Sequence, residues 1–476
     1  MKLPLAFILS SSLFFTNCNC DDQQTQSVEN AENNDTTTQL NGSCDTDADC
    51  SYNGSCEEEE CNCFSPWSGE GCNELTLGVV DKSDYGYREG FPYTTSWGGS
   101  VQYDEETEQY IMLVSEYIEE CENWAANSTV VIATSTNPEG PYEKQYRLFG
   151  AMSHEAMFAR APTGEWVVYF TAKEQDNGLP LDGNGIPAAD TICTRDDYES
   201  PCNCGENASS YSNDPTWMSY TATPLEYDSW STPEKIFDPG QHFTDTVPGG
   251  DRAESIDANF NGVILNDGSF VGLWRTWQNG GDLVPPWSER LEGIEDEEAF
   301  SVPHAIKVND WKNTASYADE ISESKSDLDW LFEEEYYVAP EIHLTGGIED
   351  PMVYIDARSP NVYHAIFHEM FNPQDNVSHA YSTDGNNWTY TGPVFSLEEN
   401  MPLVEFTDGT QAGLACERPQ LILKDGIPTH IIIGGIPTGL GNDPDYPEEG
   451  LEDVTDQAST FGWPGGATMV IPLVTP

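Results

Sequence analysis

The chain has 476 residues and carries 83 Asp and Glu against 18 Lys and Arg, which gives a net charge of −65. Nucleic-acid binding and binding to anionic membrane surfaces both need clustered basic residues, and this composition excludes them. Disorder along the whole chain is also excluded, because 38% of the residues are hydrophobic and 11% are aromatic. We therefore expect a folded acidic protein whose partner is neutral or cationic.

The N-terminus predicts secretion. Lys2 precedes an apolar block from Leu3 to Phe15, which is shorter than the ~20 residues that span a membrane. Residues 1–20 are therefore expected to be a signal peptide, and no transmembrane segment is expected. Residues 21–43, rich in Gln, Asn, Thr and Asp, predict a disordered linker. The mature protein should be secreted and extracellular. Sequons for N-glycosylation, which agree with this route, occur at Asn34, Asn41, Asn53, Asn127, Asn207, Asn376 and Asn387.

Six cysteines follow the linker within a short segment. They are Cys44, Cys50, Cys56, Cys61, Cys63 and Cys72. So short a segment of a secreted chain has too little core to fold alone, so the cysteines predict a disulfide framework. Their spacing alone leaves fifteen pairings open.

The segment 44–73 resembles an EGF-like module. One residue separates the fourth and fifth cysteines, eight separate the fifth and sixth, and Trp67 and Gly69 lie in the last loop. The resemblance implies the pairs Cys44–Cys56, Cys50–Cys61 and Cys63–Cys72, and a surface open to a cell-surface or matrix partner. We also expect reduction of the disulfides to unfold this segment alone, while the rest of the folded chain, held by its own core, survives. The calcium-binding variety has acids just before the first cysteine, which residues 41–43 lack. We expect no cofactor, with a structural calcium ion left open.

The segment 75–476 has the character of a strand-rich fold. Runs such as YIMLVSEY, EWVVYFTA and SFVGLWRT combine β-branched and aromatic residues between turn signals. A motif of polar opening, strand, turn and strand occurs five times, with openings near Ser96, His154, Asp257, Glu349 and Glu417. The intervals leave room for four strands each. We therefore predict an all-β protein, a five-bladed β-propeller whose first strands line a central channel.

The segment 75–476 also resembles the secreted five-bladed propellers of glycoside hydrolase family 43, related more distantly to invertase-like enzymes. The likeness lies in SWGGSV (96–101), EDPMVY (349–354), YHAIFH (363–368) and ERPQL (417–421). It implies a carbohydrate partner and a pocket in which one protonated and one ionised carboxyl cleave a glycosidic bond. In that family an Asp opens the first blade as the base, but here Ser96 to Gly99 supply no carboxylate.

The resemblance and the blade openings together select the candidate site. The predicted catalytic residues are Glu349, Asp257, Asp350 and Glu417. Asp257 matches the acid that tunes the site. Alternation in a strand lets only one of Glu349 and Asp350 face the pocket. Glu349 is assigned as the general acid, because its longer side chain reaches an axial substrate and the matching family position is a Glu. Asp350 would anchor its blade. The predicted substrate-binding residues are Trp97, His154, Glu155, Arg418, Arg275 and His368.

Structural roles compete with these assignments. In a chain with 83 acids, an Asp or Glu at a blade opening is usually a cap or a solvated group. Arg418 clamps an anionic substrate group or pairs internally with Glu417. His364 and His368 lie four apart on a strand without a third ligand, so no metal is predicted. The pairing of the other cysteines stays open, namely Cys121, Cys193, Cys202, Cys204 and Cys416.

Two functions of different classes follow from the sequence. The first is a secreted glycoside hydrolase that cleaves a polysaccharide or oligosaccharide in an axial acidic pocket. The second is a non-catalytic carbohydrate-binding or adhesion protein on the same propeller. The acid-rich openings favour the first, and the missing carboxylate of the first blade favours the second.

Overall fold

The computed structural model describes most of the strand-forming part of the chain. The described residues are 44–81, 86–87, 95–117, 128–151, 153–172, 215–237, 255–256, 259–279, 299–317, 348–369, 376–395, 403–409, 411–413, 417–435 and 467–474. The predicted signal peptide, the linker, Asp257 and the five cysteines from Cys121 onward lie outside these residues. Within them, no helix is both long enough and apolar enough to span a membrane.

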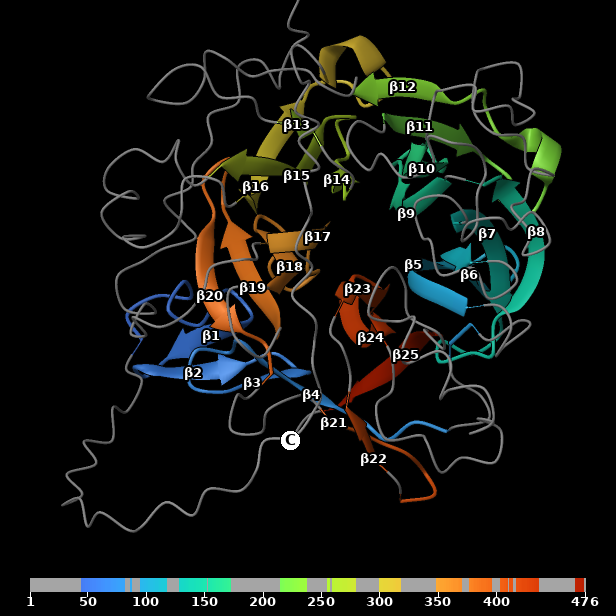
Figure 1. Cartoon of the computed structure of the whole chain (residues 1–476). Helices are drawn as coiled ribbons and strands as arrows, with labels where there is room; N and C mark the ends of the chain where they lie inside the picture. Colours follow the sequence, from blue (N-terminus) through green and yellow to red (C-terminus); the bar gives the residue numbers. More distant parts are fainter. Residues whose placement is uncertain are drawn as a thin grey trace, which may run out of the picture. The chain divides into compact units, whose positions relative to one another are not determined.

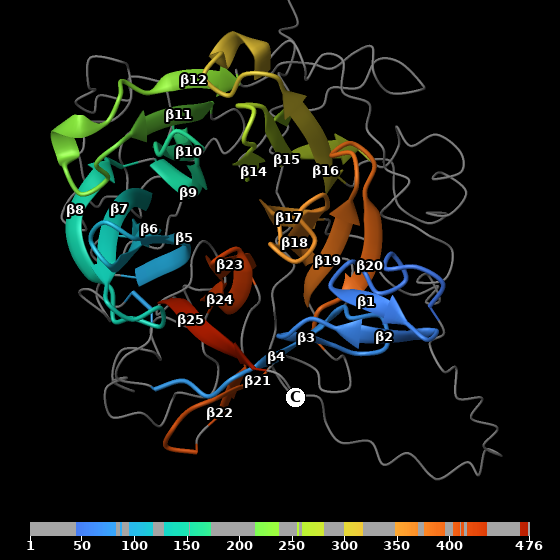
Figure 2. The same ribbon diagram turned by 180° about the vertical axis from the view of Figure 1, so that it is seen from behind.

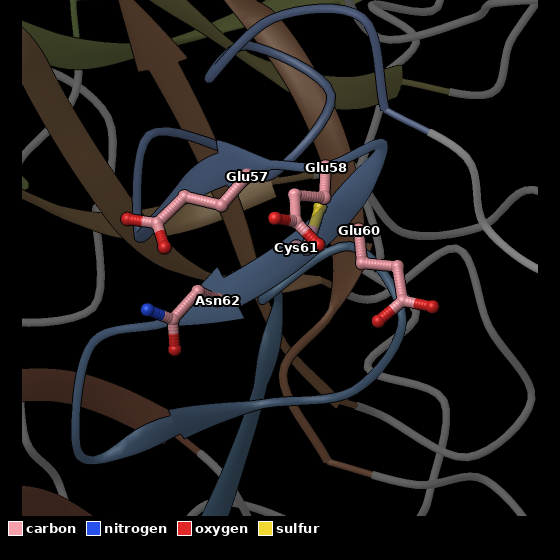
Figure 3. A pocket seen from close by; sticks show the side chains of 5 residues that line it. All are labelled: Glu57, Glu58, Glu60, Cys61 and Asn62. Carbon is pink, nitrogen blue, oxygen red and sulfur yellow. The ribbon is translucent and has the colours of Figure 1, made fainter.

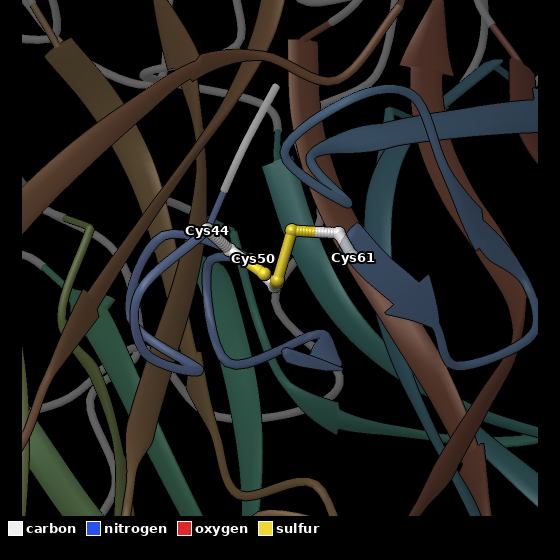
Figure 4. A group of neighbouring side chains, drawn as sticks. All are labelled: Cys44, Cys50 and Cys61. Atoms are coloured by element: carbon white, nitrogen blue, oxygen red, sulfur yellow. A yellow bond between two sulfur atoms is a disulfide. The ribbon is translucent and has the colours of Figure 1, made fainter. Parts of the chain in front are cut away.

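The disulfide module, residues 44–73, is held by the pairs that the sequence resemblance implied. They are Cys44–Cys56, Cys50–Cys61 and Cys63–Cys72, with S–S distances of 2.01, 2.02 and 2.03 Å. Strands β1 (Gly54–Glu57) and β2 (Glu60–Cys63) form its hairpin, and β3 (Trp67–Ser68) follows. Cys44 lies beside the Cys50–Cys61 bond (Figure 4). All three sulfurs are in disulfides, so this cluster offers no thiolate to a metal.

Five antiparallel sheets form a five-bladed propeller, which confirms the predicted fold class. Blade one is β5 (Thr95–Asp104), β6 (Gln109–Tyr117), β7 (Ser128–Ser135) and β8 (Glu143–Phe149). Blade two is β9 (Ser153–Arg160), β10 (Trp166–Ala172), β11 (Thr216–Thr221) and β12 (Glu234–Phe237), with the short helix η2 (Tyr227–Ser229) before β12. Blade three is β13 (Ser255–Ile256), β14 (Asn261–Ile264), β15 (Phe270–Asn279) and β16 (Ala299–Val308). Blade four is β17 (Ile348–Tyr354), β18 (Tyr363–Glu369), β19 (Asn376–Ser382) and β20 (Thr389–Pro393).

Blade five is completed by the N-terminal part of the chain. Its strands β23 (Glu417–Lys424), β24 (Ile427–Gly435) and β25 (Ala467–Val474) are followed by β4 (Glu74–Leu77), which pairs with β25 on one side and with β3 on the other. A hairpin of β21 (Leu403–Glu405) and β22 (Gln411–Gly413) precedes this blade in sequence. The first strands β5, β9, β14, β17 and β23 lie innermost (Figures 1 and 2). Closing the ring with a strand from the other end of the chain links the first and last blades covalently.

The burial pattern explains why these segments form blades. Every residue of β7 and of β10 is buried, because inner strands are covered on both faces by neighbouring blades. The outer strand β8 instead has an exposed and partly buried first half. Apolar clusters join successive blades, as where Phe149 of blade one stacks on Phe170 of blade two at 3.8 Å. Trp274 is buried in such a cluster.

The disulfide module packs on the propeller, which differs from a module that folds on its own. Leu75, which follows the module in sequence, donates a hydrogen bond from its backbone N–H to the carbonyl of Val394 at 2.6 Å. The side-chain amide of Asn73 donates to the carbonyl of Thr391 at 3.0 Å. The Trp67 ring lies 5.1 Å from that of His379. Three of the module's cysteines, Cys44, Cys50 and Cys72, belong to the same apolar cluster as residues of blades four and five. Disulfides and a shared core therefore stabilise this part of the chain together.

The described sequons differ in access. Asn53 and Asn376 are buried, and a buried amide cannot receive a glycan in the folded protein. Asn387 is exposed in a turn, where its side-chain amide donates to Asp384 at 2.6 Å. Of these three, Asn387 alone could carry a glycan in the folded state.

Two buried histidines lie where the disulfide module meets blade four. His364 Nδ1 is 3.1 Å from His379 Nε2, and His379 Nδ1 is 2.7 Å from the hydroxyl of Thr391. Burial lowers the pKa of His364 to about 4, and burial beside His364 lowers the pKa of His379 well below 6.5. Both rings are therefore neutral in the folded protein at neutral pH.

This pair predicts acid destabilisation. Unfolded, each ring takes up a proton near pH 6.5, whereas His364 does so near pH 4 when folded, so the unfolded chain binds more protons in between. The contribution to stability is complete above pH 6.5 and falls as the pH drops toward 4, by about 3 kcal/mol for His364. Urea unfolding at about pH 7.5 and about pH 5 measures this loss, and a His379→Gln variant should lose less. Equal losses in both proteins would contradict the assignment.

Candidate functional site

The five blade openings share one backbone feature that the sequence did not reveal. A residue with a left-handed φ lies at the opening of each first strand, inside the strand in blades one, two, four and five and just before β14 in blade three. These residues, called here the axial ring, are Gly98, Glu155, Asn259, Asp350 and Arg418, with φ of 65, 56, 69, 52 and 52°. In blades one, two, four and five a β-bulge accompanies the residue. Such backbone costs about 1–3 kcal/mol per non-glycine residue and clusters at functional sites.

The bulge changes how Glu349 and Asp350 are arranged. Simple alternation along a flat strand does not apply, because the register shifts between Glu349 and Met352 and Asp350 has a positive φ. Asp350 is buried, and its Oδ2 accepts a hydrogen bond from the backbone N–H of Arg418 at 3.2 Å. It therefore links blade four to blade five. Glu349 keeps 20% of its side chain exposed.

Arg418 joins four blades at the axial ring. Its Nη2 donates to Glu155 Oε1 of blade two at 2.8 Å, and its Nη1 lies 3.3 Å from the carbonyl of Trp97 in blade one. Its Nε is 3.9 Å from Asp350 Oδ1. The side chain is buried, and the carboxylates around it raise the pKa of Arg418 further above its ordinary value despite that burial. The sequence left open an internal pair with Glu417, whereas the ion pairs of Arg418 are with Glu155 and Asp350.

Glu349 lies in a cluster of charged side chains. It forms an ion pair with Arg275 of blade three. Polar atoms of Glu349, Asp350 and His368 all lie within 4.8 Å of one another, and Glu349 is the cross-strand neighbour of His368. Arg275 and Arg418 therefore supply the positive charge that balances the carboxylates of blade four.

Glu417 has a different setting on the neighbouring blade. Its Oε2 accepts a hydrogen bond from Trp97 Nε1 at 2.7 Å, and the residue is partly exposed. Loss of water around the carboxyl raises the pKa of Glu417 to about 7, and the charges of Glu349 and Asp350 act in the same direction, against His368 and Arg418. Near neutral pH a large fraction of Glu417 is protonated.

Most of the predicted site residues meet at the axial ring. Trp97, His154, Glu155, Arg275, His368 and Arg418 are buried. Glu349 and Glu417 are the partly exposed acids among the predicted residues that the structure describes. Sequence reasoning did not select Gly98 or Ser115, whose hydroxyl lies 3.4 Å from Arg418 Nη1. Ser115 lies in the second strand of blade one, where no sequence signal sets it apart.

A separate hollow lies on the disulfide module. It is lined by Glu57, Glu58, Glu60, Cys61 and Asn62 of the β1–β2 hairpin (Figure 3). The three carboxylates fan outward in different directions. They therefore do not form the convergent pair of acids that glycosidic chemistry needs.

No protein-family model matches the chain, and no curated protein matches its sequence. Among solved structures, an inulosucrase from Halalkalicoccus jeotgali bound to kestose is 11% identical, with 84% of this chain and 89% of that chain covered and a TM-score of 0.43. A family 117 glycoside hydrolase of the marine bacterium Zobellia galactanivorans is 10% identical, with 84% and 90% covered and a TM-score of 0.40.

A third similar structure is an α-L-arabinofuranosidase from Podospora anserina in complex with cellotriose. It is 10% identical, with 85% of this chain and 98% of that chain covered and a TM-score of 0.41. Identities of 10 to 11% and TM-scores below 0.5 carry no argument about activity.

Proposed function

We propose that this protein is a secreted glycoside hydrolase in which Glu417 is the general acid and Glu349 is the ionised carboxylate. The observation that carries the proposal is the contrast between these two acids. Both are partly exposed and lie on neighbouring blades, but Glu349 is ion-paired with Arg275, while burial raises the pKa of Glu417 to about 7. Glycosidic cleavage requires one protonated and one ionised carboxyl.

The chemistry divides between the two side chains. Protonated Glu417 gives its proton to the glycosidic oxygen as the bond from that oxygen to the anomeric carbon breaks. Glu349 either accepts a proton from the attacking water or attacks the anomeric carbon itself, and water then completes the hydrolysis. This reverses the role that the sequence assigned to Glu349, because an acid paired with Arg275 holds its negative charge and is a poor proton donor.

The remaining predicted residues support this pair in the proposal. Trp97 orients the Glu417 carboxyl through its indole N–H, and Asp350 anchors blade four to blade five. Asp257 keeps the tuning role that the family resemblance implies. The disulfide module is proposed to be EGF-like. Its exposed face leaves open a cell-surface or matrix partner, and we propose no cofactor.

A carbohydrate-binding protein without catalysis is the second candidate. Two observations favour it. The first blade has no carboxyl at its opening. Glu155 and Asp350 are buried and bound to Arg418. Such a protein would bind glycans through the same openings and release no products.

Assay of the purified protein on a panel of plant and algal polysaccharides and oligosaccharides separates the candidates. We expect release of reducing ends from at least one glycan, and loss of that activity in Glu349→Gln with unchanged glycan binding. Glu143→Gln, on the outer strand of blade one, is the matched control and should retain activity. Binding without product release would support the second candidate, and wild-type turnover by Glu349→Gln would exclude the role assigned to Glu349.

A further inference from the structure

Three side chains that can bind a metal meet at the opening of blade four. They are the carboxylates of Glu349 and Asp350 and the imidazole of His368, and one polar atom of each lies within 4.8 Å of the other two. Glu349 is the cross-strand neighbour of His368, and the β-bulge in β17 places Asp350 beside them. On the sequence, His364 and His368 lacked a third ligand. In the structure His364 contacts His379, and His368 lies beside two carboxylates instead.

Asp350 has an unused acceptor atom in this cluster. The residue is 3% exposed, and its Oδ2 accepts the hydrogen bond from the backbone N–H of Arg418. Its Oδ1 accepts no hydrogen bond from the described residues and is 3.9 Å from Arg418 Nε, which is too far for one. A buried carboxylate oxygen without a hydrogen bond costs free energy. A cation bound within the cluster would remove that cost.

The balance of charge around this cluster also favours a cation. Three carboxylates, those of Glu155, Glu349 and Asp350, take part in its ion pairs. They face two guanidiniums, those of Arg275 and Arg418. The net charge of −65 on the whole chain further raises the concentration of cations near the protein. Arg275 is the group that competes with a metal, because it is ion-paired with Glu349.

The types of ligand atom indicate which ion fits. Ca²⁺ takes about six to eight oxygen ligands and Mg²⁺ also prefers oxygen, whereas an imidazole nitrogen suits Zn²⁺ and transition metals. Three protein ligands with water in the fourth position are a usual arrangement around Zn²⁺. Tetrahedral Zn²⁺ needs ligand atoms about 3.4 Å apart. A separation of up to 4.8 Å therefore has to shorten, and Glu349, with 20% of its side chain exposed, has room to move.

We propose that Glu349, Asp350 and His368 form a zinc site, and that a bound Zn²⁺ ion inhibits the protein and is not a cofactor of its reaction. The zinc site is independent of the proposed function. The inhibition rests on that function, in which Glu349 is the ionised carboxylate. A carboxylate bound to zinc can neither accept a proton from the attacking water nor attack the anomeric carbon, so the ion and the reaction compete for Glu349.

Titration calorimetry of the chelator-treated protein with ZnCl₂ tests the site and needs no glycan. We expect one zinc site, with affinity lower by about 100-fold or more in His368→Gln, because loss of even an outer-shell partner costs about 10–100-fold. Arg275→Met should bind zinc more tightly, because it removes the cation that competes for Glu349. CaCl₂ should bind at least about tenfold more weakly. His430→Gln, which removes an imidazole paired with Glu139, is the matched control and should keep the wild-type affinity.

Glu349→Gln replaces the partly exposed ligand and keeps the test decisive if His368→Gln does not fold. Wild-type zinc affinity in every folded variant, or equal binding of calcium, would place the ions on other acids and overturn the inference. The expected variant pattern in a protein that cleaves no glycan would support the zinc site and refute hydrolysis. In an active protein, saturating zinc should abolish turnover and a chelator should restore it. Full turnover by the zinc-loaded protein would overturn the inhibition.

Discussion

Glu417→Gln is expected to lower turnover by about 10²–10⁴-fold, the usual contribution of a general acid, with little change in folding. Gln is close in shape and its carbonyl oxygen still accepts the hydrogen bond from Trp97, but it has no proton to give to the leaving oxygen. Steady-state kinetics on the best glycan of the panel, with thermal melting for stability, measures both effects. Glu143→Gln serves again as the control.

The nature of the leaving group separates a proton donor from other roles. An aryl glycoside whose phenol leaves readily needs little protonation, so Glu417→Gln should keep most of its activity on that substrate. Equal losses on both substrates would assign Glu417 a different role. In the wild type, kcat should also fall above about pH 7, by about tenfold per pH unit, because the pKa of about 7 leaves less protonated Glu417 at each step.

The raised pKa of Glu417 also makes the stability of the folded protein depend on pH. The folded pKa of about 7 is above the ordinary 4.5, so the folded state holds the proton more tightly. Its contribution is present below pH 4.5 and is lost as the pH rises to 7. The histidine pair acts in the reverse direction, which favours an intermediate pH for maximal stability.

Local patterns in the sequence predicted the blades and the disulfides. Strands alternate with turns over a few residues, and five repeats of one strand–turn–strand motif leave few architectures open. The disulfide pairs followed from a resemblance in cysteine spacing. In each case the information lies within about one structural unit of the chain.

Contacts between residues that are far apart in the chain could not be predicted from the sequence. Arg418 and Glu155 are 263 positions apart, and nothing in their local sequence predicts their ion pair. The left-handed residues of the axial ring include Glu155 and Arg418, types that rarely adopt this conformation, so no glycine marks the bulges of blades two and five. The charge states of Glu349 and Glu417 depend on these contacts, so their roles needed the structure.

The strand pairing that closes the propeller ring also could not be predicted from the sequence. Residues 74–77 have no pattern that predicts pairing with a strand near residue 470, yet β4 is the fourth strand of blade five. Cys72, whose sulfur is bonded to Cys63, lies two residues before this strand. The Cys63–Cys72 disulfide therefore lies next in sequence to the strand that closes the propeller.

Reduction of the disulfides is expected to destabilise the module and the propeller in a single transition. Loss of a native disulfide typically costs about 2–5 kcal/mol in a small domain, and here the cysteines share a core with blades four and five. Calorimetry of the protein with and without reductant should show one peak that moves to lower temperature. The double variant Cys63→Ser/Cys72→Ser should shift the same peak without reductant.

Two independent units would behave differently. The propeller peak would keep its temperature while the module melted separately, and that outcome would contradict a shared core. Trp67→Ala sharpens the test because it leaves all cysteines in place. Trp67 is buried against His379, so its truncation should cost about 3–5 kcal/mol and lower the same single peak. A cavity in the module that lowers the melting temperature of the propeller requires the two to unfold as one cooperative unit.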